Sequence, residues 1–230
     1  MLAPAKLTRS LRITGVRPDG FHLIDAEMVS LDLMDTLTFA EGDGLELLGA
    51  GADVPTGDDN LVRSALRLAK RTALVRVEKR IPSGAGLGGG SADAAAVLRW
   101  AGYEDAVSAA SLGADVPFCL IGGRARVCGA GELVEPLPFL PLSFTLLTPP
   151  LHCSTPAVYR AWDDLGGPSA VGPNDLEPAA LLVAPDLAIW RDRLGDATGL
   201  TPVLAGSGST WFVDGEHDGD GFVVAHTVPA

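Results

Sequence analysis

A run of glycines between residues 84 and 90 constrains this chain more than any other feature of its sequence. Glycine fills five of these seven positions, in the segment GAGLGGG. The alternating segment Leu74–Lys79 before the glycines predicts a strand, and the alanine-rich stretch Ala92–Trp100 after them favours a helix, with Ser91 as its predicted cap. The sequence therefore predicts a strand, a glycine-rich loop and a helix in succession.

A loop of this kind is suited to holding a phosphate group. Glycine has no Cβ, so backbone N–H groups can approach an anion closely, and the N-terminus of the following helix adds about half a positive charge. A tight turn from strand to helix is the simpler alternative, but such a turn needs only one or two glycines. We therefore expect the loop to bind a ligand that carries phosphate.

Several phosphate-binding patterns share features with this loop. Gly84, Gly86 and Gly89 satisfy G-x-G-x-x-G, which occurs in dinucleotide-binding folds and in kinase loops. A dinucleotide fold also needs an acidic residue about 20 residues further on, and the chain has Ala-Ala-Ser around Ala109. The Gly-Lys-Ser/Thr of P-loops and the His-Arg-Asp and Asp-Phe-Gly motifs of protein kinases are absent from the sequence. A different architecture for phosphoryl transfer is needed.

The composition excludes other classes of function. The net charge of −12 and the lack of clustered Lys and Arg argue against binding to nucleic acid. We expect no membrane association and no export, because apolar runs fall short of about 18–20 residues and the N-terminus lacks the apolar core of a signal peptide. Three cysteines at irregular spacing predict neither a disulfide framework nor a metal knuckle, and they fit a cytoplasmic location.

The remaining segments predict a mixture of helices and strands. Asn60 is the expected cap of a helix that runs to about Lys70. Further strands are expected at Arg9–Thr14, Met28–Leu33, Val116–Ile121, Ala125–Val127 and Phe144–Leu147, and further helices near Pro156–Trp162 and Asp175–Val183. Three prolines within Pro136–Pro141 predict a boundary between two domains, 1–138 and 139–230.

Four motifs, in this order along the chain, resemble those of the GHMP kinase superfamily. They are PAKL at 4–7 together with ITGVRPDGFH at 13–22, GAGLGGGSADAAAVL at 84–98, LGADVPF at 112–118, and AGSGS at 205–209. The resemblance covers about residues 4–212. It implies a two-domain α+β fold, with an N-terminal ATP-binding part like domain 2 of ribosomal protein S5 and a shortened, ferredoxin-like C-terminal part. DGFH and LGADVP are most similar to the branch that acts on a cytidine-diphosphate-linked methylerythritol.

The resemblance implies a small-molecule kinase that uses ATP and Mg²⁺ to phosphorylate the 2-hydroxyl of this alcohol. Asp115 matches the family's proton acceptor, and Lys6 matches the lysine whose charge stabilises that carboxylate; as plain sequence they are a turn or cap residue and a solvated lysine. The residues expected to bind ATP are Pro82, Ser83, Gly84, Ala85, Gly86, Leu87, Gly88, Gly89, Gly90, Ser91, Ala92 and Asn60. Ser91 is also the candidate Mg²⁺ ligand. We expect a monomer or a homodimer.

The resemblance also implies a site for the cytosine of the substrate. Phe21 and His22 match the pair that meets cytosine by stacking and by hydrogen bonding, with Phe in place of the commoner Tyr. Tyr159 matches an aromatic residue on the opposite side, so cytosine is expected between Phe21 and Tyr159. The complete set expected to contact substrate is Thr8, Phe21, His22, Thr155, Tyr159, Gly206 and Gly208. Apart from the resemblance, the two glycines could equally form a hairpin turn before a strand at Thr210–Val213.

Some features depart from the family and leave alternatives open. Thr8 stands where the family usually has Asn, and the segment Ala101–Ser111 and the C-terminal tail are short. The alternatives are a GHMP kinase for another small alcohol, a catalytically silent nucleotide-binding homologue, and a dinucleotide oxidoreductase. The presence of the loop, Lys6 and Asp115 together favours an active kinase.

Overall fold

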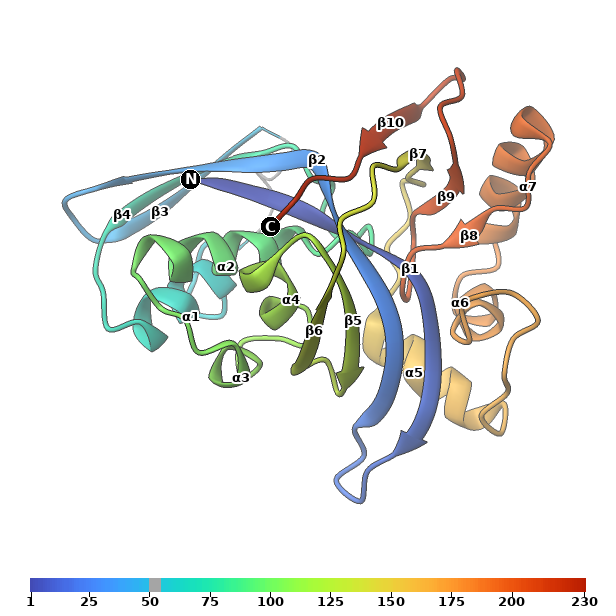
Figure 1. The fold of residues 1–230 in the computed structure, drawn as a ribbon, viewed down its shortest axis with the longest axis horizontal. Coiled ribbons are helices and arrows are strands. Elements are labelled where there is room, and N and C mark those ends of the chain that lie inside the picture. Colours follow the sequence, from blue (N-terminus) through green and yellow to red (C-terminus); the bar gives the residue numbers. More distant parts are fainter. Residues whose placement is uncertain (50–54) are drawn as a thin grey trace.

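The computed structural model describes residues 1–49 and 55–230 and contains two β-sheets flanked by helices (Figure 1). The strands are β1 (Leu2–Val16), β2 (His22–Ala40), β3 (Gly44–Gly49), β4 (Leu74–Lys79), β5 (Arg124–Gly129), β6 (Leu133–Leu137), β7 (Ser143–Leu147), β8 (Val203–Leu204), β9 (Trp211–Asp214) and β10 (Phe222–His226). The helices are α1 (Leu61–Leu68), α2 (Gly89–Trp100), α3 (Ala106–Ala109), α4 (Val116–Ile121), α5 (Thr155–Asp164), α6 (Glu177–Val183) and α7 (Leu187–Thr198). The predicted α+β class is confirmed.

The first sheet is built on the long antiparallel pair of β1 and β2. Its strand order is β3-β4-β2-β5-β6, with β1 paired to β2. The helices α1 to α4 lie together beside this sheet, and the hairpin of β1 and β2 extends past them toward α5 (Figure 1). β1 and β2 exceed the predicted strands Arg9–Thr14 and Met28–Leu33, because they pair along their whole lengths, from Leu2 opposite Thr36 to Val16 opposite His22.

The edge of β1 that does not pair with β2 binds the glycine loop and the segment before α6. On the side away from β2, Lys6 N–H donates to the carbonyl of Leu87 in the glycine loop, at 3.0 Å. Leu11 N–H donates to Pro173 O, and Leu11 O accepts from Asp175 N–H, each at 2.9 Å. Because backbone groups at a sheet edge otherwise remain unpaired, these bonds fix both the glycine loop and the segment before α6 against β1.

The second sheet has the order β10-β7-β9-β8, with all its neighbouring strands antiparallel. After β10 the chain returns to the first sheet, where Val228 N–H donates to Ser30 O at 2.9 Å. The predicted strand at Phe144–Leu147 is confirmed as part of β7. The boundary between 138 and 139 falls between β6 and β7, which belong to different sheets, and it stays a prediction.

The predicted succession of strand, glycine loop and helix is confirmed, but the predicted cap of the helix is wrong. β4 spans Leu74–Lys79 as expected, whereas α2 begins at Gly89, so that Ser91 lies within its first turn. The N-cap is Gly88 in a left-handed conformation with φ 69°, which glycine adopts without steric cost. No side chain among the described residues caps α2, so its first backbone N–H groups are left to face other partners.

The segment Val116–Ile121, predicted as a strand, is the helix α4. A short run of apolar residues fits a buried strand and a buried helix equally well, because both faces are covered in each case. Pro117 in the first turn favours a helix start. Val116 and Phe118 are both buried, since α4 packs against α2, β1 and β6.

The other predicted elements agree with the structure. Asn60 caps α1 by accepting a hydrogen bond from Val62 N–H at 2.9 Å. The strand at Ala125–Val127 lies within β5, and the two later helices correspond to α5 and α6.

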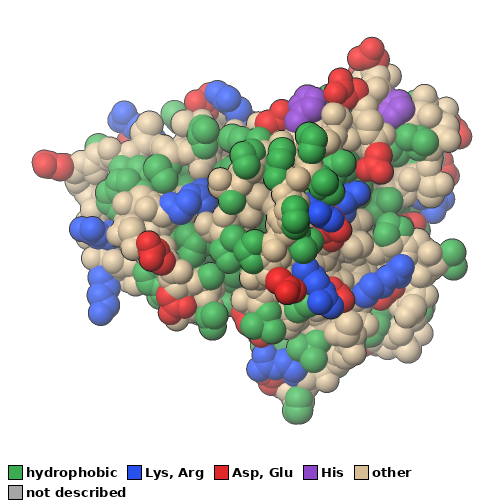
Figure 2. Space-filling model, viewed as in Figure 1, with side chains coloured by type: hydrophobic (Ala, Val, Ile, Leu, Met, Phe, Trp, Pro, Cys, Tyr) green, Lys and Arg blue, Asp and Glu red, His purple; other side chains and the backbone are tan. Residues whose placement is uncertain are grey.

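The surface agrees with the expected absence of a large basic region on the face that Figure 2 shows. Acidic and basic side chains alternate across this face, and apolar side chains gather near its centre (Figure 2). Within the described ranges, no helix combines the length and the apolar composition needed to cross a bilayer.

We expect the change Phe118→Ala to lower the free energy of unfolding by about 3–5 kcal/mol, because it removes a fully buried ring from the contact between α4 and the sheet. Phe139→Ala is the matched control, since Phe139 is 45% exposed and should cost several-fold less. Urea denaturation of both variants measures the difference. Similar losses would contradict the packing described for α4.

Candidate active site

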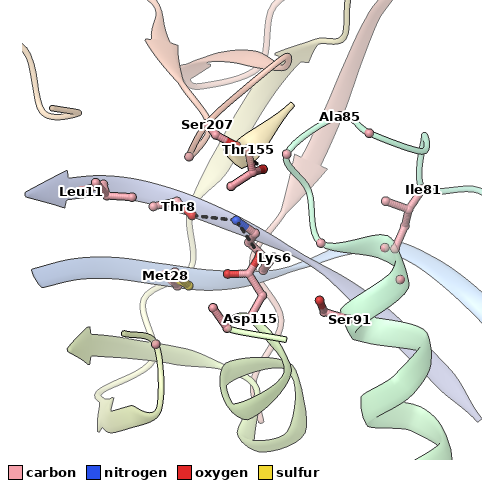
Figure 3. A pocket seen from close by; sticks show the side chains of 18 of the residues that line it. Lys6, Thr8, Leu11, Met28, Ile81, Ala85, Ser91, Asp115, Thr155 and Ser207 are labelled. Atoms are coloured by element: carbon pink, nitrogen blue, oxygen red, sulfur yellow. Dashed lines mark hydrogen bonds and ion pairs between the residues drawn. The ribbon is translucent and has the colours of Figure 1, made fainter. Parts of the chain in front are cut away.

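A cleft of about 450 Å³ lies where β1, the glycine loop, the start of α4 and α5 meet. The close view in Figure 3 shows Lys6 and Thr8 projecting from β1, with Asp115 below them and Ser91 at the start of α2. Thr155 and Ser207 close the opposite side (Figure 3). The cleft therefore collects side chains from both parts of the chain around one lysine.

Lys6 is the centre of the polar groups in this cleft. Its side chain is almost completely buried, and its Nζ lies 3.2 Å from Asp115 Oδ2 and donates to Thr8 Oγ1 at 3.1 Å. Asp115 is the N-cap residue of α4, yet its carboxylate makes no cap hydrogen bond and turns to Lys6. Burial, and secondarily the Asp115 carboxylate, raises the pKa of the neighbouring Cys119 thiol to about 12. That thiol therefore stays protonated, and the carboxylate of Asp115 is the acidic group that lies beside Lys6 in the cleft.

The glycine loop is shaped by positive φ angles and by close neighbours. Gly84, Gly86 and Gly88 have φ values of 70°, 77° and 69°. A Cβ on Gly88 would lie 2.7 Å from Lys6 Cγ, and one on Gly86 would lie 2.5 Å from Ala205 O. These positions exclude side chains on two grounds, backbone conformation and space, and the loop therefore presents its backbone to the cleft.

The AGSGS segment at 205–209 forms a second glycine loop that packs directly on the first. Thr210 N–H donates to Ala85 O at 3.1 Å, and Thr155 Oγ1 lies 2.8 Å from Ser207 Oγ. Buried Asn174 holds this loop, because its Nδ2 donates to Gly206 O at 2.7 Å and to a second carbonyl in β8. The hairpin alternative also applies, since β8 and β9 flank the loop as an antiparallel pair.

A buried ionic cluster underlies the glycine loop. Lys79 Nζ, at the end of β4, donates to carboxylates of Asp35 on β2 and Asp93 on α2. Asp35 Oδ1 also accepts from the backbone N–H groups of Arg80 and Ile81, at 2.5 and 2.9 Å. Burial raises the pKa of Asp93 to about 7, and its Oδ1 has no hydrogen-bond partner among the residues that the structure describes. The cluster thus ties both ends of the loop to the first sheet.

A second cavity of about 310 Å³ adjoins the cleft and contains the predicted residue Asn60. Lys79, Ser83 and Gly90 line both cavities. Asn60 is therefore a cap of α1 and also faces a space next to the glycine loop, which agrees with both roles considered for it.

The aromatic residues expected to contact cytosine do not all line the cleft. His22 and Tyr159 line the cleft with ring centroids 4.7 Å apart. Burial, with a smaller effect of Asp115, raises the pKa of the Tyr159 phenol above its ordinary value, so the phenol stays neutral. Phe21 is 61% exposed and lines a separate, shallow pocket with Arg17 and Val107. The placement of a base between Phe21 and Tyr159 stays a prediction.

Most of the predicted site residues line this one cleft. They are Lys6, Thr8, His22, Pro82, Ser83, Gly84, Ala85, Gly86, Gly88, Gly89, Gly90, Ser91, Asp115, Thr155, Tyr159 and Gly206. Leu87 and Ala92 are buried beneath the loop, Asn60 lies in the adjoining cavity, and Gly208 packs against Leu204 and Cys153.

Some residues of the site were not predicted from the sequence. Ser207 lies inside the AGSGS motif, where only the two glycines were selected, and Lys79 is the last residue of β4, the strand before the loop. The local contact of Asn174, whose Oδ1 accepts from Leu176 N–H, indicates only a turn. Its other partners, Leu204 and Gly206, lie about 30 residues away.

The described residues contain no group of three or more His, Cys, Asp or Glu side chains placed to hold a metal ion. Mg²⁺ commonly binds one or two protein groups and completes its shell with substrate phosphates and water. Ser91 and Asp115 both line the cleft, and Figure 3 shows Ser91 at the start of α2. The Ser91 hydroxyl fits such a sparse protein contribution.

Comparisons with a family model, with relatives in sequence and with solved structures agree with one another. Residues 60–123 match the model of the GHMP kinases N-terminal domain. The chain is 41% identical to the 4-diphosphocytidyl-2-C-methyl-D-erythritol kinase of Paracoccus denitrificans, over 91% of this chain and 84% of the relative. It is 38% identical to the protein of the same name from Pelotomaculum thermopropionicum, over 92% and 87%. A crystal structure of 4-(cytidine 5'-diphospho)-2C-methyl-D-erythritol kinase matches with a TM-score of 0.75 and 36% identity, over 92% and 88%.

We expect Gly86→Ala to destabilise the protein more than Gly102→Ala does. Both glycines have positive φ, of 77° and 71°, so both changes cost about 1–2 kcal/mol of backbone strain. Only at position 86 would the new Cβ also meet backbone atoms, at 2.5 and 2.6 Å, whereas position 102 is open. Urea denaturation compares the two, and equal losses would contradict the contact between the glycine loops.

Asp93 should make stability depend on pH. Its pKa of about 7 in the folded protein exceeds the ordinary 3.8, so the folded state holds the proton more tightly. Its stabilising effect is therefore fully present below about pH 4 and is lost as pH rises through about 7. Relative to Asp93→Asn, the wild-type free energy of unfolding should fall over this interval.

Denaturation of both proteins at pH 5 and pH 8 measures this effect. Asp218→Asn, at an exposed position, should follow the wild type at both pH values. Parallel behaviour of wild type and Asp93→Asn would show that Asp93 does not hold this proton.

Proposed function

The chain belongs to the 4-diphosphocytidyl-2-C-methyl-D-erythritol kinases, within the GHMP kinases, and we propose that it transfers the γ-phosphoryl group of ATP to the 2-hydroxyl of that cytidyl alcohol. The chain covers more than four fifths of the relatives it matches. We infer that the short segments noted in the sequence affect its periphery, because the predicted residues Lys6, Asp115 and Ser91 line one cleft.

The observation that carries this proposal is the position of Asp115 and Lys6 beside the glycine loop. Lys6 Nζ is 3.2 Å from the carboxylate, and Lys6 Cγ is the closest neighbour that a Cβ on Gly88 would meet. A proton acceptor, a cation and a phosphate cradle therefore lie within one cleft. Phosphoryl transfer to an alcohol needs these three parts, because its catalysis consists mainly of positioning and charge stabilisation.

Each part has a distinct task in the proposed reaction. Backbone N–H groups of the glycine loop and of the first turn of α2 hold the triphosphate of ATP. The Asp115 carboxylate accepts the proton of the attacking hydroxyl, and the Lys6 ammonium balances negative charge between hydroxyl and phosphoryl group. Thr8, which accepts a hydrogen bond from Lys6, restricts the ammonium to this direction. The products are ADP and the phosphorylated alcohol, without a covalent enzyme intermediate.

We propose that Mg²⁺ is held by Ser91 together with phosphate oxygens. When bound, the ion neutralises charge on the phosphates and holds them in line with the acceptor. The protein's own contribution is the Ser91 hydroxyl on the first turn of α2.

The substrate and the setting of the reaction follow from the same residues. We place ATP toward the cavity that contains Asn60, and the cytidyl alcohol toward His22, Thr155 and Tyr159. Domains at 1–138 and 139–230 would contribute the two sides of the cleft. Three free cysteines support a cytoplasmic location. We retain monomer and homodimer as the two candidate states.

Asp115→Asn should lower kcat by about 10²–10⁴-fold, because the amide cannot accept the proton. A coupled assay of ADP release with the cytidyl alcohol measures this loss, and Asp218→Asn serves as an exposed control. Isothermal titration with ATP accompanies the assay. ATP binding without turnover by the wild type would indicate the silent homologue, and full activity of Asp115→Asn would overturn the assigned role.

A further inference from the structure

The side chain of His22 contacts one face of α5, a helix from the C-terminal part of the chain. His22 begins β2, and its ring lies against Tyr159 and, edge-on at 5.5 Å between centroids, against Trp162 of α5. Its Nε2 lies 2.8 Å from Oδ1 of Asp163. These three positions on α5 are spaced as neighbours on a helix surface, so α5 determines how the imidazole is oriented.

The helix that carries Asp163 is itself anchored. Val158 is fully buried, and Trp162 is nearly so. Trp162 Nε1 donates to Pro168 O at 3.0 Å. Asp163 is therefore carried on a fixed backbone, although its own side chain is 47% exposed. A contact with so exposed a carboxylate contributes little to folding, about 0–1 kcal/mol, so its main effect is on the orientation of His22.

The contact with Asp163 also selects a form of the imidazole. A carboxylate only accepts hydrogen bonds, so the hydrogen of a neutral His22 ring is placed on Nε2 and Nδ1 keeps its lone pair. His22 lines the cleft, where it can therefore offer an acceptor. Cytosine carries a donor amino group at C4, whereas uracil carries a carbonyl acceptor at the same position. An acceptor from the protein favours the first and opposes the second.

We propose that Asp163 is a positioning residue that holds His22 in this form and thereby makes the site prefer cytosine over uracil. The inference rests on the proposed function, because that function places the cytidyl group near His22. Beyond that function, the inference assigns part of the selectivity for the base to Asp163 on α5, a residue that need not contact the substrate.

Calorimetric titration with CDP and with UDP, at pH 8, tests the inference directly. The wild type should bind CDP more tightly than UDP. Asp163→Ala should reduce the ratio of the two affinities about tenfold, as expected for one hydrogen bond, and Asp163→Glu should restore part of it. Asp164→Ala, at the exposed next position of α5, is the matched control and should keep the wild-type ratio.

Two further measurements separate positioning from a general structural defect. In the kinase assay, Asp163→Ala should raise KM for the cytidyl alcohol while kcat stays within about twofold, because no reacting atom is lost. The ¹⁵N NMR shifts of His22 should show hydrogen on Nε2 in the wild type and a mixture of tautomers in Asp163→Ala.

The outcomes distinguish this inference from the proposed function. An equal affinity of the wild type for CDP and UDP, or an unchanged ratio in Asp163→Ala, would overturn the role of Asp163 even if the cytidyl alcohol is phosphorylated. An absence of turnover by the wild type would overturn the proposed function, whereas the ratio of CDP to UDP affinity still tests Asp163 independently.

Discussion

The site depends on the burial of one positive charge, that of Lys6. A buried ammonium needs close partners, because its loss of hydration is costly, and Lys6 Nζ finds them in Asp115 and Thr8. Its backbone N–H meanwhile binds Leu87, and its side-chain carbons fill the space that a side chain at Gly88 would need. The same residue thus fixes the strand, the loop and the start of α4 relative to one another.

Local signals in the sequence predicted the parts of the fold whose causes are local. The glycine loop, β4 and the cap Asn60 each follow from residues within a few positions of one another. Two predictions were wrong for other reasons. The apolar run at α4 was predicted as a strand, because such a run suits a helix and a strand alike until its neighbours are known. Ser91 was predicted to cap α2, whereas the N-cap is Gly88. The contact of Asn174 with Leu204 and Gly206 could not be found, because these two partners are distant in sequence.

The residues of the site also divide into those that the sequence predicted and those that only the structure revealed. Resemblance to a kinase family supplied Asp115 and Lys6, which composition and spacing alone would have left as a turn residue and a surface lysine. The structure brings them together with the loop. It also adds Lys79 and its two carboxylate partners, where long-range pairing between β2, β4 and α2 decides the arrangement. An acidic chain with a net charge of −12 can therefore serve an anionic ligand, because a few directed donors act locally. On the face that Figure 2 shows, acidic and basic side chains are interspersed.

The hydrogen bonds on the edge of β1 away from β2 make the two parts of this protein difficult to separate. Separating the C-terminal part would remove the partners of Leu11 on the segment before α6. The N-terminal fragment would then expose unsatisfied backbone groups along an extended strand, which is the arrangement that promotes self-association. The C-terminal part therefore covers this edge of β1, and an N-terminal fragment cut between the sheets would tend to aggregate.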